Sequence, residues 1–322
     1  MQLRSEAMRL HRLASSRVRR SVVLVTATVM AMLAIVLGGC EPRTRAAATD
    51  TGEPRESGRQ IQASPASFGK PLTIVALGDS YSSGEGNGPF DVDAPGCNRG
   101  ADAWPRLLGQ EIAGSTVRMI ACSGAKTSAF TTSFHGQPPQ LEALRALVAG
   151  GVKPDVVTIT IGGNDAGFGP AIVSCVVWRC FWNGRDDNTR EYVRDKLPPL
   201  LQTAYTQVKE AAGGARVIVI GYPSLFPSST ANTCKWLSNN ERVQLIGLNG
   251  DLNRVIRRAA GKADVDFLSI DGVLDDHKLC TKDPWVHPVA VTGAGLQASA
   301  HLNSAGQHAI ADTVHAYLAK GR

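Results

Sequence analysis

Residues 72–86 read Leu72-Thr-Ile-Val-Ala-Leu-Gly-Asp-Ser-Tyr-Ser-Ser-Gly-Glu-Gly86. A short apolar run followed by turn-forming residues is typical of a strand buried on both faces of a parallel sheet. This strand is predicted to end at Gly78-Asp79, so Ser80 is the first side chain beyond its carboxyl end. In open α/β sheets the functional site lies at the carboxyl ends of the strands. Ser80 is therefore a candidate nucleophile.

The glycine-rich turn also has a purely structural interpretation, in which Ser80 only caps the first turn of a helix. Other motifs of this kind do not fit. No Gly-Lys-Ser/Thr follows, as a phosphate-binding loop requires, and 84–88 lacks the dinucleotide-binding spacing. Ser82 stands where the nucleophile elbow of another hydrolase class has glycine.

Apolar runs and helical spacing alternate along the rest of the chain. Strands are predicted at 72–77, 116–121, 155–161, 215–220 and 265–270. Helices are predicted at 139–148, 189–212, 239–260 and 303–319, with a break or kink at Pro198-Pro199. This alternation predicts a three-layer α/β/α sandwich around a central, mostly parallel five-stranded sheet of flavodoxin-like architecture.

Residues 1–40 have the pattern of an export leader. Arginines precede an apolar core at 21–36 that is short for a membrane span and typical of a signal peptide. Leu37-Gly38-Gly39-Cys40 resembles the bacterial lipobox, in which the cysteine is lipidated and becomes the mature N-terminus. A plain signal peptide and an uncleaved anchor are the alternatives.

Two further segments complete the predicted organisation. Residues 41–70 are rich in Ala, Pro, Ser, Thr, Arg and Glu without hydrophobic periodicity, which indicates a flexible tether. Residues 71–322 are long enough for one well-buried α/β domain. Removal of the leader lowers the formal net charge from +6 to about +1, so the mature chain has no basic surplus for nucleic acid.

Six cysteines lie beyond Cys40. An even number in an exported chain predicts disulfide bonds, with the pairing left open. No Cys-x-x-Cys or His-x-x-x-His spacing indicates a zinc site. These residues are Cys97, Cys122, Cys175, Cys180, Cys234 and Cys280.

Two more glycine-containing turns follow predicted strands. Cys122-Ser-Gly-Ala125 comes after the second strand and Gly162-Gly-Asn-Asp165 after the third, so both belong to the sheet edge that carries Ser80. Acyl transfer needs hydrogen-bond donors aimed at a developing oxyanion, and backbone N–H groups and a neutral amide supply them. Two ordinary strand-to-helix turns are the structural alternative.

Two histidines compete for the role of general base. His287 lies in Asp283-Pro-Trp-Val-His-Pro288, where no helical pattern follows. His301 directly precedes an amphipathic helix that Asn303 or Ser304 is predicted to cap. The context favours His301.

These segments together resemble the sequence blocks of the GDSL/SGNH esterases and lipases, especially the secreted actinobacterial branch. The blocks are 78–86, 122–125, 162–165 and His301-Leu-Asn-Ser-Ala-Gly306. The resemblance implies a serine ester hydrolase that needs no metal or organic cofactor. It assigns Ser80 as nucleophile and His301 as base, with an oxyanion hole formed by Ser80 N–H, Gly124 N–H and the Asn164 amide.

The resemblance also implies disulfide bonds in sequence order, which are Cys97–Cys122, Cys175–Cys180 and Cys234–Cys280. One departure concerns the residue three positions before His301, where the family usually has Asp and this chain has Ala298. Some secreted members use a main-chain carbonyl, so we expect the Ala298 carbonyl or a neighbour to support the histidine. Asp283, moving in from the preceding loop, is the alternative acid. Leu302 also replaces the usual proline.

The expected function is that of an exported esterase or lipase acting as a monomer on a lipid or an acylated small molecule. It would be lipid-anchored through Cys40 at the outer face of the membrane, or secreted. A carbohydrate O-deacetylase acting on envelope polysaccharide and a non-catalytic envelope-binding lipoprotein are the alternatives. Trp178, Phe181 and Trp182 form either a wall for an acyl chain or local packing.

Overall fold

The computed structural model of the chain describes residues 70–178, 180, 185–228, 234–293 and 295–320. The predicted leader, with Cys40, and the predicted tether up to residue 69 lie outside the described residues. Within the described ranges, every helix is too short or too polar to cross a membrane.

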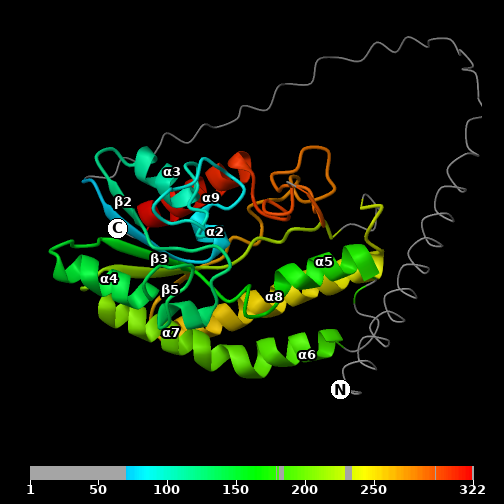
Figure 1. Ribbon diagram of the computed structural model, residues 1–322, viewed down its shortest axis with the longest axis horizontal. Coiled ribbons are helices and arrows are strands. Elements are labelled where there is room, and N and C mark those ends of the chain that lie inside the picture. The colour runs from blue at the N-terminus through cyan, green and yellow to red at the C-terminus, as the bar shows by residue number, and fades with distance from the viewer. Residues whose placement is uncertain (1–69, 179, 181–184, 229–233, 294, 321–322) are drawn as a thin grey trace, which may run out of the picture. The chain divides into compact units, whose positions relative to one another are not determined.

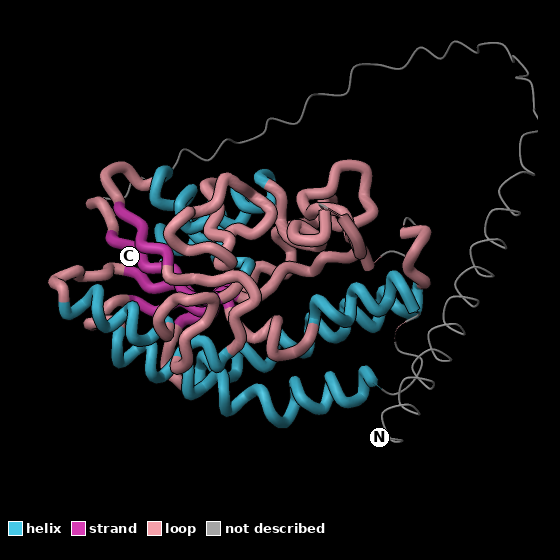
Figure 2. Tube along the Cα trace, in the orientation of Figure 1, coloured by secondary structure: helices cyan, strands magenta, loops and turns pink. Residues whose placement is uncertain are grey.

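The centre of the described fold is one parallel sheet of five strands in the order β2-β1-β3-β4-β5. Figure 2 shows the strands side by side, with helices on both sides of them. The predicted α/β sandwich is therefore confirmed, and every described pairing in the sheet is parallel. The strands are β1 (Thr73–Gly78), β2 (Thr116–Met119), β3 (Val156–Thr160), β4 (Arg216–Ile220) and β5 (Asp266–Leu268).

Alternate side chains of β1 enter two separate hydrophobic cores. Ile74 packs in the core that includes residues of α3 (Trp104–Glu111) and α9 (Ser304–Lys320). Val75 and Leu77 pack on the opposite face, where the other set of helices covers the sheet. Each such side chain contributes about 1.5–3 kcal/mol when fully buried. The second set is α4 (Gln140–Ala149), α7 (Leu197–Ala211) and α8 (Asn239–Lys262) (Figure 1).

The break predicted at Pro198-Pro199 corresponds to a junction between helical segments. A π-helical segment, η3 (Tyr192–Lys196), ends where α7 begins at Leu197, so both prolines lie in the first turn of α7. Proline is tolerated there because the N–H that it lacks has no partner within the helix. The remaining helical segments are α2 (Ser80–Ser83), η2 (Thr127–Phe130), α5 (Phe168–Trp178) and α6 (Arg185–Glu191).

The carboxyl end of β1 is fixed by close backbone contacts. Gly78 has φ +118°, and a Cβ atom on it would lie 2.0 Å from the carbonyl oxygen of Thr160 in β3. Only glycine fits this approach. The Gln140 side chain accepts a hydrogen bond from Gly78 N–H and donates one to its carbonyl, both at 2.8 Å. These contacts fix the position of Gly78 and therefore of Asp79 and Ser80, which follow it.

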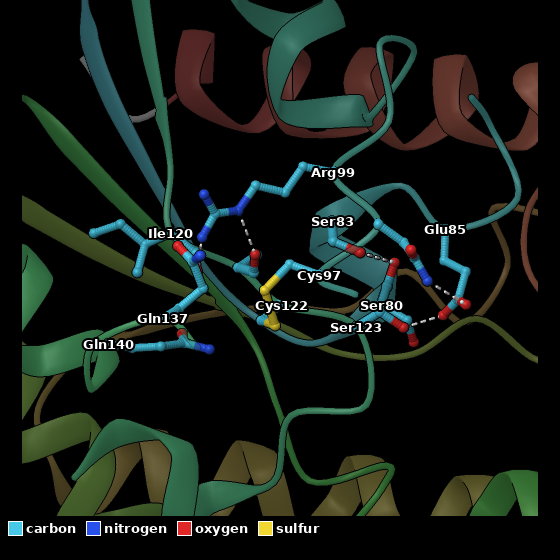
Figure 3. The surroundings of a disulfide bond; sticks show 12 residues. Ser80, Ser83, Glu85, Cys97, Arg99, Ile120, Cys122, Ser123, Gln137 and Gln140 are labelled. Carbon is cyan, nitrogen blue, oxygen red and sulfur yellow. Dashed lines mark hydrogen bonds between the residues drawn. A yellow bond between two sulfur atoms is a disulfide. The ribbon is translucent and has the colours of Figure 1, made fainter. Parts of the chain in front are cut away.

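The three predicted disulfide bonds are present. They are Cys97–Cys122, Cys175–Cys180 and Cys234–Cys280. The first joins the segment after α2 to the turn beyond β2, and Figure 3 shows it close to Ser80 and Ser123.

Candidate active site

Ser80 is the first residue of the short helix α2. Asp79 caps this helix, because its carboxylate accepts a hydrogen bond of 3.1 Å from Tyr81 N–H. Gly84 ends the helix in the left-handed conformation, at φ 78°. The side chain of Ser80 is thereby held at the carboxyl edge of the sheet, where the residue is 7% exposed.

His301 reaches Ser80 from the other end of the domain sequence. Its Nε2 atom lies 2.9 Å from Ser80 Oγ. The helix α9 begins three residues later, and Asn303 caps it by accepting a hydrogen bond of 3.2 Å from Gly306 N–H. The histidine that the sequence context favoured therefore lies next to the serine.

His287 lies beside His301 instead of opposite Ser80. Its backbone N–H donates a 2.8 Å hydrogen bond to the carbonyl oxygen of His301. The ring of His287 packs against Gly86, where an added Cβ would lie 2.9 Å from its Cδ2 atom. Burial lowers the pKa of His287, an effect that a contact with the Gly86 backbone opposes.

Of the groups expected to support the base, Ala298 and Asp283 bond elsewhere, whereas the carbonyls of Ser299 and Gln297, which flank Ala298, act on the ring of His301. The carbonyl of Ala298 accepts a 3.0 Å hydrogen bond from the backbone N–H of His301, because the two residues close a tight turn. Asp283 is 79% exposed, and its carboxylate lies 3.4 Å from Nδ1 of His277. Neither group hydrogen-bonds the Nδ1 atom of His301, which is buried without a hydrogen-bond partner among the described residues.

Several neighbours act on the protonation of His301. Burial is the largest influence and lowers its pKa, while the Glu85 carboxylate and the backbone carbonyls of Ser299 and Gln297 raise it. His287 lowers the pKa further. The net direction is downward, so the ring is neutral at neutral pH and able to accept a proton.

Asp79 connects the end of β1 to the neighbouring strands. Its carboxylate accepts hydrogen bonds from the Tyr222 hydroxyl and, at 2.9 Å, from Thr160 Oγ1. The Tyr222 oxygen in turn accepts a 3.0 Å hydrogen bond from Gly163 N–H. Burial raises the pKa of Asp79 to about 7, although these donors act in the opposite direction.

The two turns that are predicted to form the oxyanion hole lie at the same edge of the sheet. Asn164 Nδ2 donates a 3.0 Å hydrogen bond to the carbonyl of Ala125, the residue after Gly124. Gly124 has φ 77°, which keeps this turn tight without a side chain. Ser80, Asn164 and His301 line one cavity of about 90 Å³ together with apolar side chains. The apolar residues include Phe168, Ile172, Leu225 and Leu252.

One acidic side chain in this site was not predicted from the sequence. Glu85 Oε2 lies 3.5 Å from His301 Nε2 and accepts a hydrogen bond from Ser123 Oγ. The only sequence signal was a carboxylate between two glycines, close after Ser80.

The predicted aromatic wall falls largely outside the described part of the chain. Trp178 is the last residue of α5, and Phe181 and Trp182 lie outside the described residues. Within the described ranges, no three His, Cys, Asp or Glu residues are grouped so that they could hold a metal ion.

Comparison with known proteins identifies the family. Residues 76–309 match the GDSL-like lipase/acylhydrolase family. Lipase 1 of Streptomyces coelicolor is 34% identical over 236 residues, which cover 72% of this chain and 81% of that protein. The similarity extends to solved structures. The crystal structure of an extracellular lipase from Streptomyces rimosus matches with a TM-score of 0.67 at 29% identity, covering 76% of this chain and 99% of that one.

A phospholipase A1 from Streptomyces albidoflavus matches equally well. Its crystal structure gives a TM-score of 0.66 at 31% identity, covering 77% of this chain and 99% of that one. The matched residues 76–309 contain the carboxyl end of β1 and all four of the sequence blocks named above. The chain belongs to the GDSL-like lipase/acylhydrolase family, as an ester hydrolase of its actinobacterial lipase branch.

Proposed function

We propose that the chain is an exported serine esterase or lipase that cleaves carboxylic esters with a Ser80–His301 dyad. The observation that carries this proposal is the 2.9 Å distance between Ser80 Oγ and His301 Nε2. A hydroxyl and a neutral imidazole at this distance are within reach for proton transfer. Because burial lowers the pKa of His301, the ring is in the required neutral form.

In the first step His301 Nε2 takes the hydroxyl proton while Ser80 Oγ bonds to the ester carbonyl carbon. The carbonyl oxygen becomes an oxyanion that we assign to Ser80 N–H, Gly124 N–H and the Asn164 amide. An amide nitrogen carries two hydrogens, and the Ala125 carbonyl accepts only one of those of Asn164. Each such donor is typically worth about 10²–10³ in kcat.

In the second step the tetrahedral intermediate collapses. The bond between the carbonyl carbon and the alcohol oxygen breaks, and His301 passes its Nε2 proton to that oxygen. Water then attacks the acyl carbon and gives a proton to His301 Nε2. The bond between that carbon and Ser80 Oγ breaks, His301 returns the proton to Oγ, and the carboxylic acid leaves. Each transfer uses a group that lies at the carboxyl edge of the parallel sheet.

Export and anchoring form the second part of the proposal. The arginine-rich start, the apolar core and the lipobox-like 37–40 segment support an exported chain that is lipidated at Cys40 or simply cleaved. The three disulfide bonds favour an oxidising compartment. A related protein, the Streptomyces rimosus lipase, is described as extracellular.

A carbohydrate O-deacetylase is the second candidate, and the size of the cavity favours it. At about 90 Å³ the cavity is small beside the roughly 300–1,000 Å³ of pockets that hold larger ligands. A short acyl group such as acetyl suits this volume. A preference for p-nitrophenyl acetate over p-nitrophenyl octanoate, with release of acetate from an acetylated oligosaccharide, would support the deacetylase.

The Ser80→Ala variant of the purified protein tests the catalytic proposal. We expect hydrolysis of both p-nitrophenyl esters to fall by at least about 10³-fold, with an unchanged melting temperature. Ser128→Ala, on an exposed serine, is the matched control and is expected to keep full activity. A folded Ser80→Ala variant with more than a few per cent of the parental activity would refute the nucleophile. An inactive parent would instead favour the non-catalytic lipoprotein.

A further inference from the structure

A carboxylate lies beside the proposed dyad on the side that faces the serine. Glu85 follows α2, and its side chain is only 10% exposed. Its Oε2 atom lies 3.5 Å from Nε2 of His301, the same nitrogen that faces Ser80. Figure 3 shows the carboxylate of Glu85 turned toward Ser123, next to Ser80.

The backbone around Glu85 leaves little freedom for this side chain. Gly84 and Gly86 flank it with φ angles of 78° and 92°, in the region that favours glycine. A Cβ on Gly84 would lie 2.5 Å from the Cβ of Ala103. A Cβ on Gly86 would meet the ring of His287 at 2.9 Å. The loop that carries Glu85 therefore packs closely against the residue that precedes α3 on one side and the ring of His287 on the other.

Neutral donors hold both oxygens of the carboxylate. Ser123 Oγ donates to Oε2, and Asn98 Nδ2 donates to Oε1 at 3.0 Å. Asn98 follows Cys97, which is bonded to Cys122 beside Ser123, so the disulfide ties the two donors together. Within the described part of the chain, no Lys or Arg forms an ion pair with Glu85. The carboxylate of Glu85 is therefore not paired with a cation and can act on His301.

Glu85 lies where a Ser–His dyad without an acid on Nδ1 needs a negative charge. His301 is buried, and the Nδ1 atom, where a catalytic triad has its acid, has no hydrogen-bond partner among the described residues. Burial disfavours the imidazolium that must form when the histidine takes the serine proton. A nearby negative charge offsets that cost, and Glu85 is the carboxylate in position to supply it.

Among the described residues, the other groups that contact His301 or shift its pKa carry no negative charge. Tyr81, from α2, has its ring centroid 5.7 Å from that of His301, and burial raises its pKa, so it is neutral. His287, from the preceding loop, lowers the pKa of His301. The backbone carbonyls of Ser299 and Gln297 contribute only partial charges.

We propose that Glu85 is a positioning residue of the Ser80–His301 dyad, whose carboxylate stabilises the imidazolium from the Nε2 side. This inference rests on the proposed function. Glu85 itself neither transfers a proton nor forms or breaks a bond. The carboxylate keeps the buried histidine basic enough to accept the Ser80 proton and pass it to the leaving alcohol.

The Glu85→Gln variant of the full protein tests this role through the pH profile of kcat/KM on p-nitrophenyl acetate. Removing the charge should move the midpoint of the acid limb to lower pH by about one to three units. The plateau of kcat should fall roughly tenfold or more. Glu142→Gln, an exposed glutamate in the first turn of α4, is the matched control and should leave both unchanged.

An acid limb that stays in place in a folded Glu85→Gln variant overturns the proposal, even if kcat falls, because a structural role predicts that result. Should Glu85→Gln fail to fold, Glu85→Asp keeps the charge but withdraws it from Nε2. A smaller shift of the midpoint in the same direction then supports the proposal, and no shift overturns it. An active Ser80→Ala variant would refute the dyad itself, whereas an inactive one with an unmoved Glu85→Gln profile refutes only the role of Glu85.

Discussion

The backbone N–H of His287 donates a 2.8 Å hydrogen bond to the carbonyl oxygen of His301. This contact belongs to a short antiparallel bridge in which Val286 pairs with Leu302. The segment that carries His287 therefore supports the loop that presents His301 to Ser80. The side chains diverge, since His301 faces Ser80 and His287 packs against Gly86.

The two histidines should respond very differently to removal. His301→Ala should lower kcat by at least about 10³-fold, as much as Ser80→Ala, because nucleophile and base act as one unit. The double variant should be no worse than either single one. His287→Ala should keep kcat within about tenfold, because the hydrogen bond between the two residues is made by backbone atoms and survives the change. Steady-state kinetics on p-nitrophenyl acetate measure all four proteins, and a His287→Ala loss equal to that of His301→Ala would contradict the assignment of the base.

Asp283 should be dispensable for catalysis. Its carboxylate is 79% exposed and lies beside His277, so Asp283→Asn should change kcat by less than about threefold. A buried triad aspartate would cost orders of magnitude when changed to asparagine. Melting temperatures of the parent and the variant serve as the control for folding. A collapse of kcat in a folded Asp283→Asn protein would show that this loop closes over His301 in solution.

Gly78 should be among the least replaceable residues of the fold. Gly78→Ala places a Cβ 2.0 Å from the Thr160 carbonyl oxygen at φ +118°, and we expect a loss of at least ~3 kcal/mol in unfolding free energy. Gly250→Ala is the matched control, because this exposed glycine lies inside α8 with nothing within 4 Å of an added Cβ. That change should gain up to ~1 kcal/mol. Urea unfolding compares the two, and equal stability in both variants would contradict the close approach of β1 and β3.

The sheet was predictable from sequence because its inner strands, β1, β3 and β4, are buried runs rich in β-branched residues. The helix α3 was not predicted, since Trp104–Glu111 is short and contains Pro105 and Gly109. Tertiary packing explains both features. Pro105 occupies the first turn, and Gly109 lets the helix approach β2, where a Cβ would lie 2.4 Å from a Val117 methyl group.

Residues of the candidate site were predictable where they stand in recognisable blocks. Ser80, Asn164 and His301 each follow a strand or precede a helix that the pattern itself predicts. The role of Glu85 depends on two left-handed glycines and on donors from a distant turn, which no local pattern encodes. The carbonyl beside His301 could not be chosen either, because that choice depends on backbone angles such as φ 57° at Ala300.

Cys40 should decide where the mature protein resides. The lipobox-like 37–40 segment predicts that the parental protein fractionates with membranes and carries a lipid on its first residue. Cys40→Ser removes the acceptor sulfur, so the chain should lose the lipid while esterase activity is retained. Mass spectrometry of the N-terminal peptide and membrane fractionation measure this. An unmodified, freely released parental chain would show that the leader is a plain signal peptide.

Asp79 should give the protein a distinctive dependence of stability on pH. Burial raises its pKa in the folded state from 3.8 to about 7, so between these values the folded protein holds a proton that the unfolded chain releases. Unfolding free energy should therefore fall as pH rises from about 4 to about 7, by an amount on the order of a few kcal/mol. Asp79→Asn cannot titrate, and its unfolding free energies at pH 4.5 and pH 7.5 should differ less than those of the parent.

An exposed aspartate provides a control of opposite sign. Lys209 lowers the pKa of Asp264, so this ion pair stabilises the fold above the ordinary aspartate pKa and loses that effect as pH falls. Asp264→Asn should leave the downward slope between pH 4.5 and pH 7.5 intact. Denaturant unfolding of the three proteins at both pH values separates the two groups. If Asp79→Asn retains the full parental slope, Asp79 is ionised throughout this range, and its three hydrogen-bond donors outweigh its burial.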